Sequence, residues 1–337
     1  MSSERQLIER VRRKIPSRAG GALRLGIGDD AAIIRVHAAH GAVDWVLTTD
    51  AFLEGVHFIL RVHPAQAVGY KALARATSDL AAMGALPQYF FMNLAIPWER
   101  TGKWLDGFLA GMARAARAFG LVLAGGDTTR QSRIAINLTV LGSIAPGQAV
   151  RRSGAKPGDA IFVSGRLGQA ELGLRLIELG LHKKAKWKKL LHKHFYPEPR
   201  LALGRLLARN KRATSSLRAT SMIDISDGLS TDLGNLCDAS GVGARIWPEK
   251  IPKVVVPDDL RKLKFDPLRL ALDGGDDYEL LFTVPRRVAK RLPKKLGGVP
   301  IARIGEITRE KRIMLVDQAG KVRPLEARGW DPFRSRR

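Results

Sequence analysis

The stretch I-D-I-S-D-G-L-S, Ile223 to Ser230, decides the fold prediction for this chain. A short apolar run carries one carboxylate at Asp224, and a second carboxylate at Asp227 stands beside a glycine. A helical pattern, Leu229–Ser240, follows at once. Open α/β folds bind ligands where strands run into helices in this way, and two carboxylates across the turn can hold a hard cation. The alternative is that Asp227 only caps the helix, and the stretch alone favours neither.

Four other stretches place carboxylates beside glycine or threonine. They are G-I-G-D-D-A-A (Gly26–Ala32), T-T-D (Thr48–Asp50), A-G-G-D-T-T-R (Ala124–Arg130) and D-G-G-D-D-Y-E (Asp273–Glu279). Adjacent carboxylates such as Asp29 and Asp30 repel unless a cation neutralises them, and hydroxyl and carboxylate oxygens are ligands that Mg²⁺ prefers. We expect T-T-D to end the strand Val43–Leu47 and A-G-G-D-T-T-R to form a loop after the strand Leu121–Leu123. Five such stretches together favour a cation and phosphate site.

Two polar side chains stand in apolar surroundings. Asp79 lies inside the predicted helix Pro64–Gly84, among alanine and leucine, where a charge is costly unless it is paired or bound to a metal. Arg75, one turn earlier, is the competing structural partner for Asp79. His57, in E-G-V-H-F, is either a substrate-facing residue or a hydrogen-bonded structural histidine.

Composition limits the class of protein. A length of 337 residues suggests two domains, and we place the boundary in the glycine- and proline-rich segment 146–158, giving domains 1–148 and 149–337. Without a run of about 18 apolar residues, a membrane span is not expected. The charged N-terminus, Met1 to Arg13, does not resemble a secretory signal. The single cysteine, Cys237, fits a reducing cytoplasm and is expected to pack in the core.

The net charge of +25 raises the question of a polyanionic partner. The surplus is concentrated in Lys183–Lys193, Arg286–Lys295 and Arg334–Arg337, away from the glycine and aspartate motifs. Aromatic residues do not alternate with the basic ones as in nucleic-acid-binding surfaces. We therefore predict a solvated basic surface, with Lys183–His194 as an exposed helical extension, and no specific nucleic-acid or membrane partner.

Helical and strand-like patterns alternate along the chain and predict an α/β fold, in a two-domain α+β form. Besides the elements above, the patterns predict helices at Gln6–Ile15, Thr101–Phe119 and Gly168–Gly180, and strands at Gln88–Ile96, Arg133–Ile144, Asp159–Ser164 and Val242–Ile246.

Seven motifs, in this order and spacing, resemble the thiamine-monophosphate kinase family. They are G-I-G-D-D-A, T-T-D with E-G-V-H-F, S-D-L-A-A-M-G, A-G-G-D-T-T-R, R-S-G-A-K-P-G-D, I-D-I-S-D-G-L and G-G-D-D-Y-E-L. The family belongs to a superfamily with aminoimidazole ribonucleotide synthetase, selenophosphate synthetase and hydrogenase maturation factors. The resemblance covers roughly residues 20 to 333. Any one motif is weak, and the set in register is specific.

The resemblance implies a two-domain enzyme with the ATP site in a cleft beneath the domains. The N-terminal domain would have a mixed sheet with helices and would pair with a second copy in a homodimer. The C-terminal domain would be an α/β domain of the aminoimidazole ribonucleotide synthetase type. The reaction would be a Mg²⁺-dependent transfer of phosphate from ATP to thiamine phosphate, giving thiamine diphosphate.

The resemblance also implies site residues, none of them a general base. Several Mg²⁺ ions would be held by Asp30, Thr48, Thr49, Asp50, Asp79, Asp127, Asp224 and Asp227, ATP would contact Gly126, Asp127, Arg152 and Ser226, and the substrate would contact His57, Asp276 and Trp330. The family's usual G-G-E-D-Y reads G-G-D-D-Y here, so Asp276 stands where glutamate is usual. The shorter side chain retains the charge but withdraws it by about one methylene group.

Another ATP-dependent member of the superfamily, such as a selenophosphate synthetase-like protein, is the alternative within enzymes. Against it, no cysteine stands near the N-terminal glycine motif. A nucleic-acid-binding protein is the alternative from another class, and it would explain the net positive charge. Against it, the glycine and aspartate motifs would then have no role.

Overall fold

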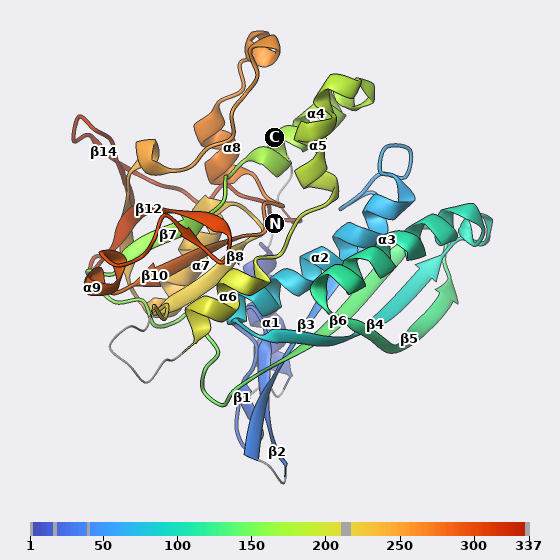
Figure 1. The fold of residues 1–337 in the computed structure, drawn as a ribbon, viewed down its shortest axis with the longest axis horizontal. Coiled ribbons are helices and arrows are strands. Elements are labelled where there is room, and N and C mark those ends of the chain that lie inside the picture. The colour runs from blue at the N-terminus through green and yellow to red at the C-terminus, as the bar shows by residue number, and fades with distance from the viewer. Residues whose placement is uncertain (1–2, 16–18, 39–40, 210–216, 334–337) are drawn as a thin grey trace.

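The computed structural model describes residues 3–15, 19–38, 41–209 and 217–333, so the basic run Arg334–Arg337 lies outside the described residues. Figure 1 shows a blue-to-green N-terminal half and a green-to-red C-terminal half, each built on one sheet with helices packed against it. This arrangement confirms the expected two-part α/β fold.

The N-terminal sheet has six strands and one helical layer. Its order is β1 (Leu23–Leu25), β2 (Ala32–Ala38), β3 (Gly41–Leu53), β6 (Ala135–Ile144), β4 (Leu86–Ile96) and β5 (Val122–Arg130). All neighbours are antiparallel except β4 and β5, which are parallel. Helices α2 (Ala65–Met83) and α3 (Lys103–Phe119) lie together over one face (Figure 1). Their close approach requires glycine, because a Cβ at Gly69 would lie 2.0 Å from the carbonyl oxygen of Phe108.

The C-terminal sheet is almost entirely antiparallel, unlike the parallel sheet of an open α/β fold. Its order is β14 (Val322–Pro324), β13 (Ile313–Val316), β9 (Gly243–Ile246), β12 (Val299–Thr308), β7 (Ala160–Ser164), β10 (Glu279–Val284) and β8 (Ser221–Ile225), with β11 (Lys295–Leu296) paired to β12. Every residue of β7, β8 and β10 is buried. The helices are α4 (Gln169–Glu178), α5 (Lys188–Phe195), α6 (Leu201–Ala208), α7 (Leu229–Ser240), α8 (Pro267–Asp273) and α9 (Arg286–Ala289).

Helix α2 belongs to the N-terminal half and also packs against the C-terminal half. Ala81 and Ala82 share an apolar cluster with Leu203 and Met222. A Cβ at Gly204 of α6 would lie 1.9 Å from the carbonyl oxygen of Ala81, so the two helices touch backbone to backbone there. This contact brings the C-terminal part of α2 beside β8, which carries Asp224.

Most predicted elements are present, including a helix with the predicted bounds Leu229–Ser240 and an N-terminal helix α1 (Glu4–Lys14). Cys237 is buried in the core, as predicted. Among the described residues, none of the helices combines the length and apolar character that crossing a bilayer requires.

Three local predictions were wrong. T-T-D does not end its strand, because β3 continues to Leu53. A-G-G-D-T-T-R is not a loop, because all of it lies in the exposed edge strand β5. The segment Lys183–His194 is not simply an exposed extension, because Trp187, Leu191 and His194 are buried.

Candidate active site

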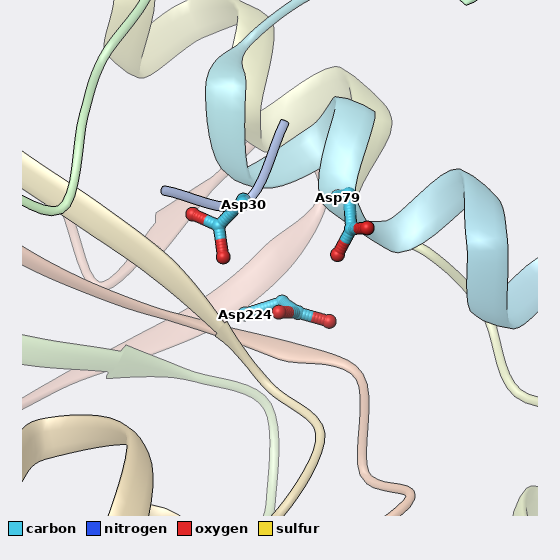
Figure 2. A group of neighbouring side chains, drawn as sticks. All are labelled: Asp30, Asp79 and Asp224. Carbon is cyan, nitrogen blue, oxygen red and sulfur yellow. The ribbon is translucent and has the colours of Figure 1, made fainter. Parts of the chain in front are cut away.

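Three carboxylates from distant parts of the chain meet at the junction of the two halves. Asp30 precedes β2, Asp79 lies on α2, and Asp224 lies on β8. One oxygen from each lies within 4.8 Å of the others, and Figure 2 shows the three side chains directed toward one space. Asp30 and Asp224 are buried and Asp79 is partly buried. We refer to these three residues as the carboxylate cluster.

Arg152 fixes one member of the carboxylate cluster. Its guanidinium donates from Nε (3.0 Å) and Nη2 (2.7 Å) to Oδ1 of Asp30. Its backbone N–H donates to the neighbouring carboxylate of Asp29. The adjacent aspartates are therefore partly neutralised by one arginine, while Oδ2 of Asp30 is buried and has no hydrogen-bond partner.

The hydroxyl of Thr48 on β3 donates to Asp79 at 2.6 Å. Because side chains alternate along a strand, Thr48 and Asp50 share the face that α2 covers. Thr49 is exposed and donates instead to Asn137 at 2.8 Å. The structure therefore brings Thr48 and Asp50 toward the carboxylate cluster and directs Thr49 to the opposite face of the sheet.

Arg75 binds Asp50, with Nε 2.6 Å from Oδ2 and Nη2 3.0 Å from Oδ1. The structural alternative, in which Arg75 pairs with Asp79, is therefore wrong. Asp79 keeps Thr48 as its hydrogen-bond donor and is not neutralised by an arginine on its own helix.

The turn after β8 does not use Asp227 as a helix cap. Gly228 occupies the capping position with φ 119° and makes no side-chain cap. The carboxylate of Asp232, inside the helix, instead accepts the backbone N–H groups of Asp227 (3.1 Å) and Gly228 (3.0 Å). The capping alternative is therefore wrong, and the carboxylate of Asp227 remains available to the site.

The electrostatics of these residues show a shortage of positive charge. Burial and the neighbouring carboxylates raise the pKa of Asp224 to about 7 and that of Asp79 well above its usual value. Burial also raises the pKa of Asp227 to about 7. Buried like charges favour protonation or a bound cation. The unpartnered oxygen of Asp30 and the converging carboxylates fit a hard divalent ion such as Mg²⁺.

A second group of side chains lies beside the carboxylate cluster. Lys71, buried on α2, donates to Asp276 at 2.7 Å, and the hydroxyl of Tyr278 donates to the same carboxylate at 2.7 Å. Burial raises the pKa of Asp276, but Lys71, His194 and Arg75 together lower it by more, so the pKa lies below its usual range. Asp276 has φ 66°, and its backbone N–H donates to the carbonyl oxygen of Ser226 at 2.8 Å.

His57 lies partly buried against Phe52, with ring centroids 5.5 Å apart. Its Nδ1 accepts the backbone N–H of Leu53 at 2.9 Å, so Nε2 carries the proton of the neutral ring and is a donor. Burial, followed by Arg75, lowers the pKa of His57 to about 4. Trp330 is held beside the turn that follows β8, because its backbone N–H donates to the carbonyl oxygen of Asp227 at 2.9 Å.

Gly126 and Asp127 lie away from the carboxylate cluster of their own chain. Strands β4 and β6 separate Asp127 on β5 from strand β3. Asp127 pairs with Asn93 on β4, and Asn93 pairs with Asn137 on β6. Asn137 pairs with Ala51 on β3. Three strand spacings amount to about 14 Å. Within one chain, Asp127 therefore cannot share an ion with Asp50.

Two family models match most of the chain. The family described as AIR synthase related protein, N-terminal domain, matches residues 28–144, and its C-terminal domain matches residues 156–318. The thiamine-monophosphate kinase of Bacillus subtilis (strain 168) is 35% identical over 319 residues, covering 92% of this chain and 94% of that protein. That of Escherichia coli (strain K12) is 36% identical over 323 residues, covering 92% of each.

The chain belongs to the thiamine-monophosphate kinase family. The structure of AaThiL complexed with AMPPCP and TMP has a TM-score of 0.82 at 29% identity, covering 98% of this chain and 97% of that one. The thiamine-monophosphate kinase from Stenotrophomonas maltophilia K279a has a TM-score of 0.72 at 36% identity, with 92% and 95% covered.

Three residues of this thiamine-monophosphate kinase family member were missed from sequence. Lys71 lies two turns and Arg75 one turn before Asp79 on the same face of α2, and this i, i+4, i+8 spacing was the signal. Lys193 was assigned to a basic run away from the motifs, and this was wrong, because it pairs with the buried Glu279 of the G-G-D-D-Y-E-L motif. No local pattern could have shown that long-range contact.

Proposed function

We propose that this chain transfers the γ-phosphate of ATP to thiamine phosphate, giving ADP and thiamine diphosphate. The observation that carries the proposal is the meeting of Asp30, Asp79 and Asp224, from three separate elements, in a thiamine-monophosphate kinase family member. The related AaThiL structure, complexed with AMPPCP and TMP, supports this pair of substrates.

Phosphate transfer to a phosphate does not require a general base. The second pKa of a phosphate monoester is about 6, so the acceptor oxygen is already ionised at pH 7. The obstacle is repulsion between two anions, which positive charge and alignment overcome. We therefore assign no residue as general base and propose direct in-line transfer without a phosphorylated enzyme.

Mg²⁺, when bound, would neutralise phosphate charge and align the two reacting groups. We assign the binding of several ions to the carboxylate cluster, with Thr48, Asp50 and Asp227 around it. Arg152 holds Asp30 by one oxygen and leaves the other free for a ligand. The hydrogen bond from Thr48 orients Asp79 in the same way.

The substrates would lie on either side of these ions. We assign ATP contacts to Arg152 and Ser226, next to the carboxylate cluster. His57, Asp276 and Trp330 would contact thiamine phosphate. Lys71 and Tyr278 fix Asp276 in position, where the family usually has glutamate.

We also propose a homodimer in which Asp127 acts in the partner's site. Asp127 lies about three strand spacings, or about 14 Å, from β3 of its own chain. All of β5 is exposed, and it forms one edge of its sheet, where it can pair with another strand. Val122 and Leu123 on β5 are exposed, as are Tyr89 and Phe91 on neighbouring β4, so this edge has an apolar surface. A second copy at this edge would bring Gly126 and Asp127 to the ATP of its partner.

The proposed reaction is tested by incubating the purified chain with ATP, Mg²⁺ and thiamine phosphate and separating the products by chromatography. Thiamine serves as the control acceptor. We expect thiamine diphosphate from the monophosphate only. Phosphorylation of thiamine itself, or no product while ATP still binds, would contradict the proposed acceptor. We place the reaction in the cytoplasm, in keeping with the single, buried and unpaired Cys237.

A further inference from the structure

A cavity of about 690 Å³ lies between the two halves of the molecule, outside the carboxylate cluster. The N-terminal strands β1 to β3 form one wall, through Arg24, Arg35 and Asp44. The connecting segment 147–156 forms a second wall, and the start of α9, with Arg287, forms a third. None of the three residues of the carboxylate cluster lines it. Its volume is typical of pockets that bind small molecules.

The lining of this cavity is strongly basic. Six cationic side chains line it against a single carboxylate, Asp44: Arg24, Arg35, Arg151, Lys156, Arg218 and Arg287. Asp44 is already neutralised by Arg35, whose Nε and Nη2 lie 2.7 Å and 2.9 Å from its two oxygens. Within the described part of the chain, Arg24, Arg151, Lys156 and Arg287 form no ion pair with a carboxylate. Such a concentration of one sign in a concave site raises the local concentration of anions.

The floor of the cavity is apolar. Ile33, Val150 and Val288 line it and are themselves buried, with exposed fractions of 2%, 2% and 8%. Arginine and lysine recognise phosphate oxygens through charge-assisted hydrogen bonds, whereas an apolar floor favours a ligand with a carbon skeleton. A cation surplus alone would suit any anion, and the floor restricts the ligand to one with an organic part.

We propose that this cavity binds a small organic phosphate at a site separate from the catalytic centre. Its phosphate would contact Arg24, Arg151 and Arg287, and its organic part would lie over Ile33 and Val288. Because Arg24 belongs to the N-terminal half and Arg287 to the C-terminal half, the ligand would hold the two halves together. Arg151 also adjoins Arg152, which binds Asp30, so an occupied cavity would stabilise the geometry of the carboxylate cluster.

The test is a calorimetric titration of the full-length chain with phenyl phosphate and, separately, with inorganic phosphate. The buffer contains EDTA, because without divalent ions the catalytic carboxylates repel anions and the cavity dominates binding. We expect one phenyl phosphate per chain, bound at least about threefold more tightly than inorganic phosphate. Inorganic phosphate that binds as tightly as phenyl phosphate, or no saturable binding at all, would overturn the proposal.

The double variant Arg24→Glu/Arg287→Glu should weaken phenyl phosphate binding by at least about tenfold. The matched control is Arg117→Glu/Arg309→Glu, which changes the net charge equally at exposed positions outside the cavity, and it should change affinity by less than about twofold. Equal weakening in both variants would show only an effect of net charge and would overturn the site.

A further variant, Arg287→Gln, covers the case in which the double charge reversal does not fold. Because Arg287 is exposed, its loss should leave thermal unfolding unchanged while reducing affinity about threefold; unchanged affinity would count against the site. Conversion of thiamine phosphate by the same variants, assayed with Mg²⁺ and ATP, reports separately on the proposed kinase activity. Failure of one proposal is thereby distinguished from failure of the other.

Discussion

Asp224 contributes a carboxylate to the site and lowers the stability of the fold. Its carboxylate is buried beside Asp30 and Asp79, and burial together with these neighbours raises its pKa to about 7. The three side chains repel one another in the absence of a cation. The energetic cost of assembling them is a sign that a positively charged ligand belongs there.

We predict that Asp224→Asn lowers kinase turnover by at least about 100-fold, because losing one charged ligand removes several kcal/mol of metal-assisted stabilisation. The metal-free variant should be at least as stable as the wild type, since one of the repelling charges is gone. Thermal unfolding should show that the stabilisation by Mg²⁺ is also lost. Asp238→Asn, on the exposed side of the neighbouring helix α7, is the control and should retain activity. Near-normal activity of Asp224→Asn would remove this residue from the metal site.

His63 and His194 give the molecule a sensitivity to acid. Their Nε2 atoms lie 3.2 Å apart, and both rings are buried. Burial lowers the pKa of His63 to about 4 and that of His194 well below its usual value. Between pH 6.5 and pH 4 the unfolded chain therefore binds protons that the native chain does not. This contribution to stability is present above the unfolded pKa and is lost as the pH falls toward the folded one.

For His63 alone, the loss between pH 7 and pH 5 amounts to about 2 kcal/mol. Between pH 7 and pH 5 the free energy of unfolding should therefore decrease less for His63→Gln than for the wild type. We predict a difference of about 2 kcal/mol between the two decreases. Urea denaturation at the two pH values measures this difference. His37→Gln, at an exposed position, should behave as the wild type. An identical pH dependence for His63→Gln and wild type would refute the assignment.

At the scale of elements, α2 organises the molecule. One face carries Lys71, Arg75 and Asp79, which contact Asp276, Asp50 and Thr48 in turn. Other faces pack against α3 and α6. A helix held from several sides keeps its polar groups in fixed positions, which is what alignment of two phosphates requires.

Glu279 on strand β10 binds Lys193, at the end of the basic segment Lys183–Lys193. This buried carboxylate accepts hydrogen bonds from Lys193, from Ser164 at 2.6 Å and from Arg200 at 2.6 Å and 2.7 Å. Burial raises the pKa of Glu279, but Lys193 and Arg200 lower it more, to about 2. These contacts attach both α5 and the start of α6 to the C-terminal sheet.

We predict that Glu279→Ala destabilises the protein by about 3–5 kcal/mol, because two largely buried cations lose their partner. Urea denaturation at pH 7 measures this cost. Glu306→Ala breaks an exposed pair with Arg245 and should cost at most about 1 kcal/mol. Similar losses in the two variants would mean that the contacts of Glu279 do not hold the segment in place.

At the scale of the whole molecule, the proposed dimer rests on the exposed edge strand β5 and on the distance between Asp127 and β3 of its own chain. We predict that Asp127→Ala and Asp224→Asn are each inactive, and that a mixture of the two recovers activity after subunit exchange. If each site uses residues of both chains, one of the two sites in a mixed dimer would contain both wild-type residues. About half of randomly formed dimers are mixed, so about one quarter of wild-type activity should return.

The measurement is the rate of thiamine diphosphate formation by the two variants after joint refolding. Each variant refolded alone is the control. If Asp127 acted within its own chain, every site in a mixed dimer would contain one altered residue, and the mixture would stay inactive. Light scattering checks separately that the refolded protein is a dimer.

The sequence alone determined the features that depend on local chemistry. The motifs identified Asp30, Asp79 and Asp224 as candidate ligands, and the limits of Leu229–Ser240 followed from glycine on each side of a helical pattern. The α/β class and the burial of Cys237 also followed from composition and spacing. These properties are set by neighbours in the chain, so a pattern is sufficient to predict them.

Only the tertiary structure decided which groups meet. It joined Arg75 to Asp50 rather than to Asp79, carried T-T-D through the middle of β3, and placed Asp127 three strands away. It also brought Lys193 to the buried Glu279. Strand register and helix packing set these contacts, and both depend on residues far apart in the chain. Local spacing carries no information about such distances, because the close packing of α2 between the two sheets is a property of the folded molecule as a whole.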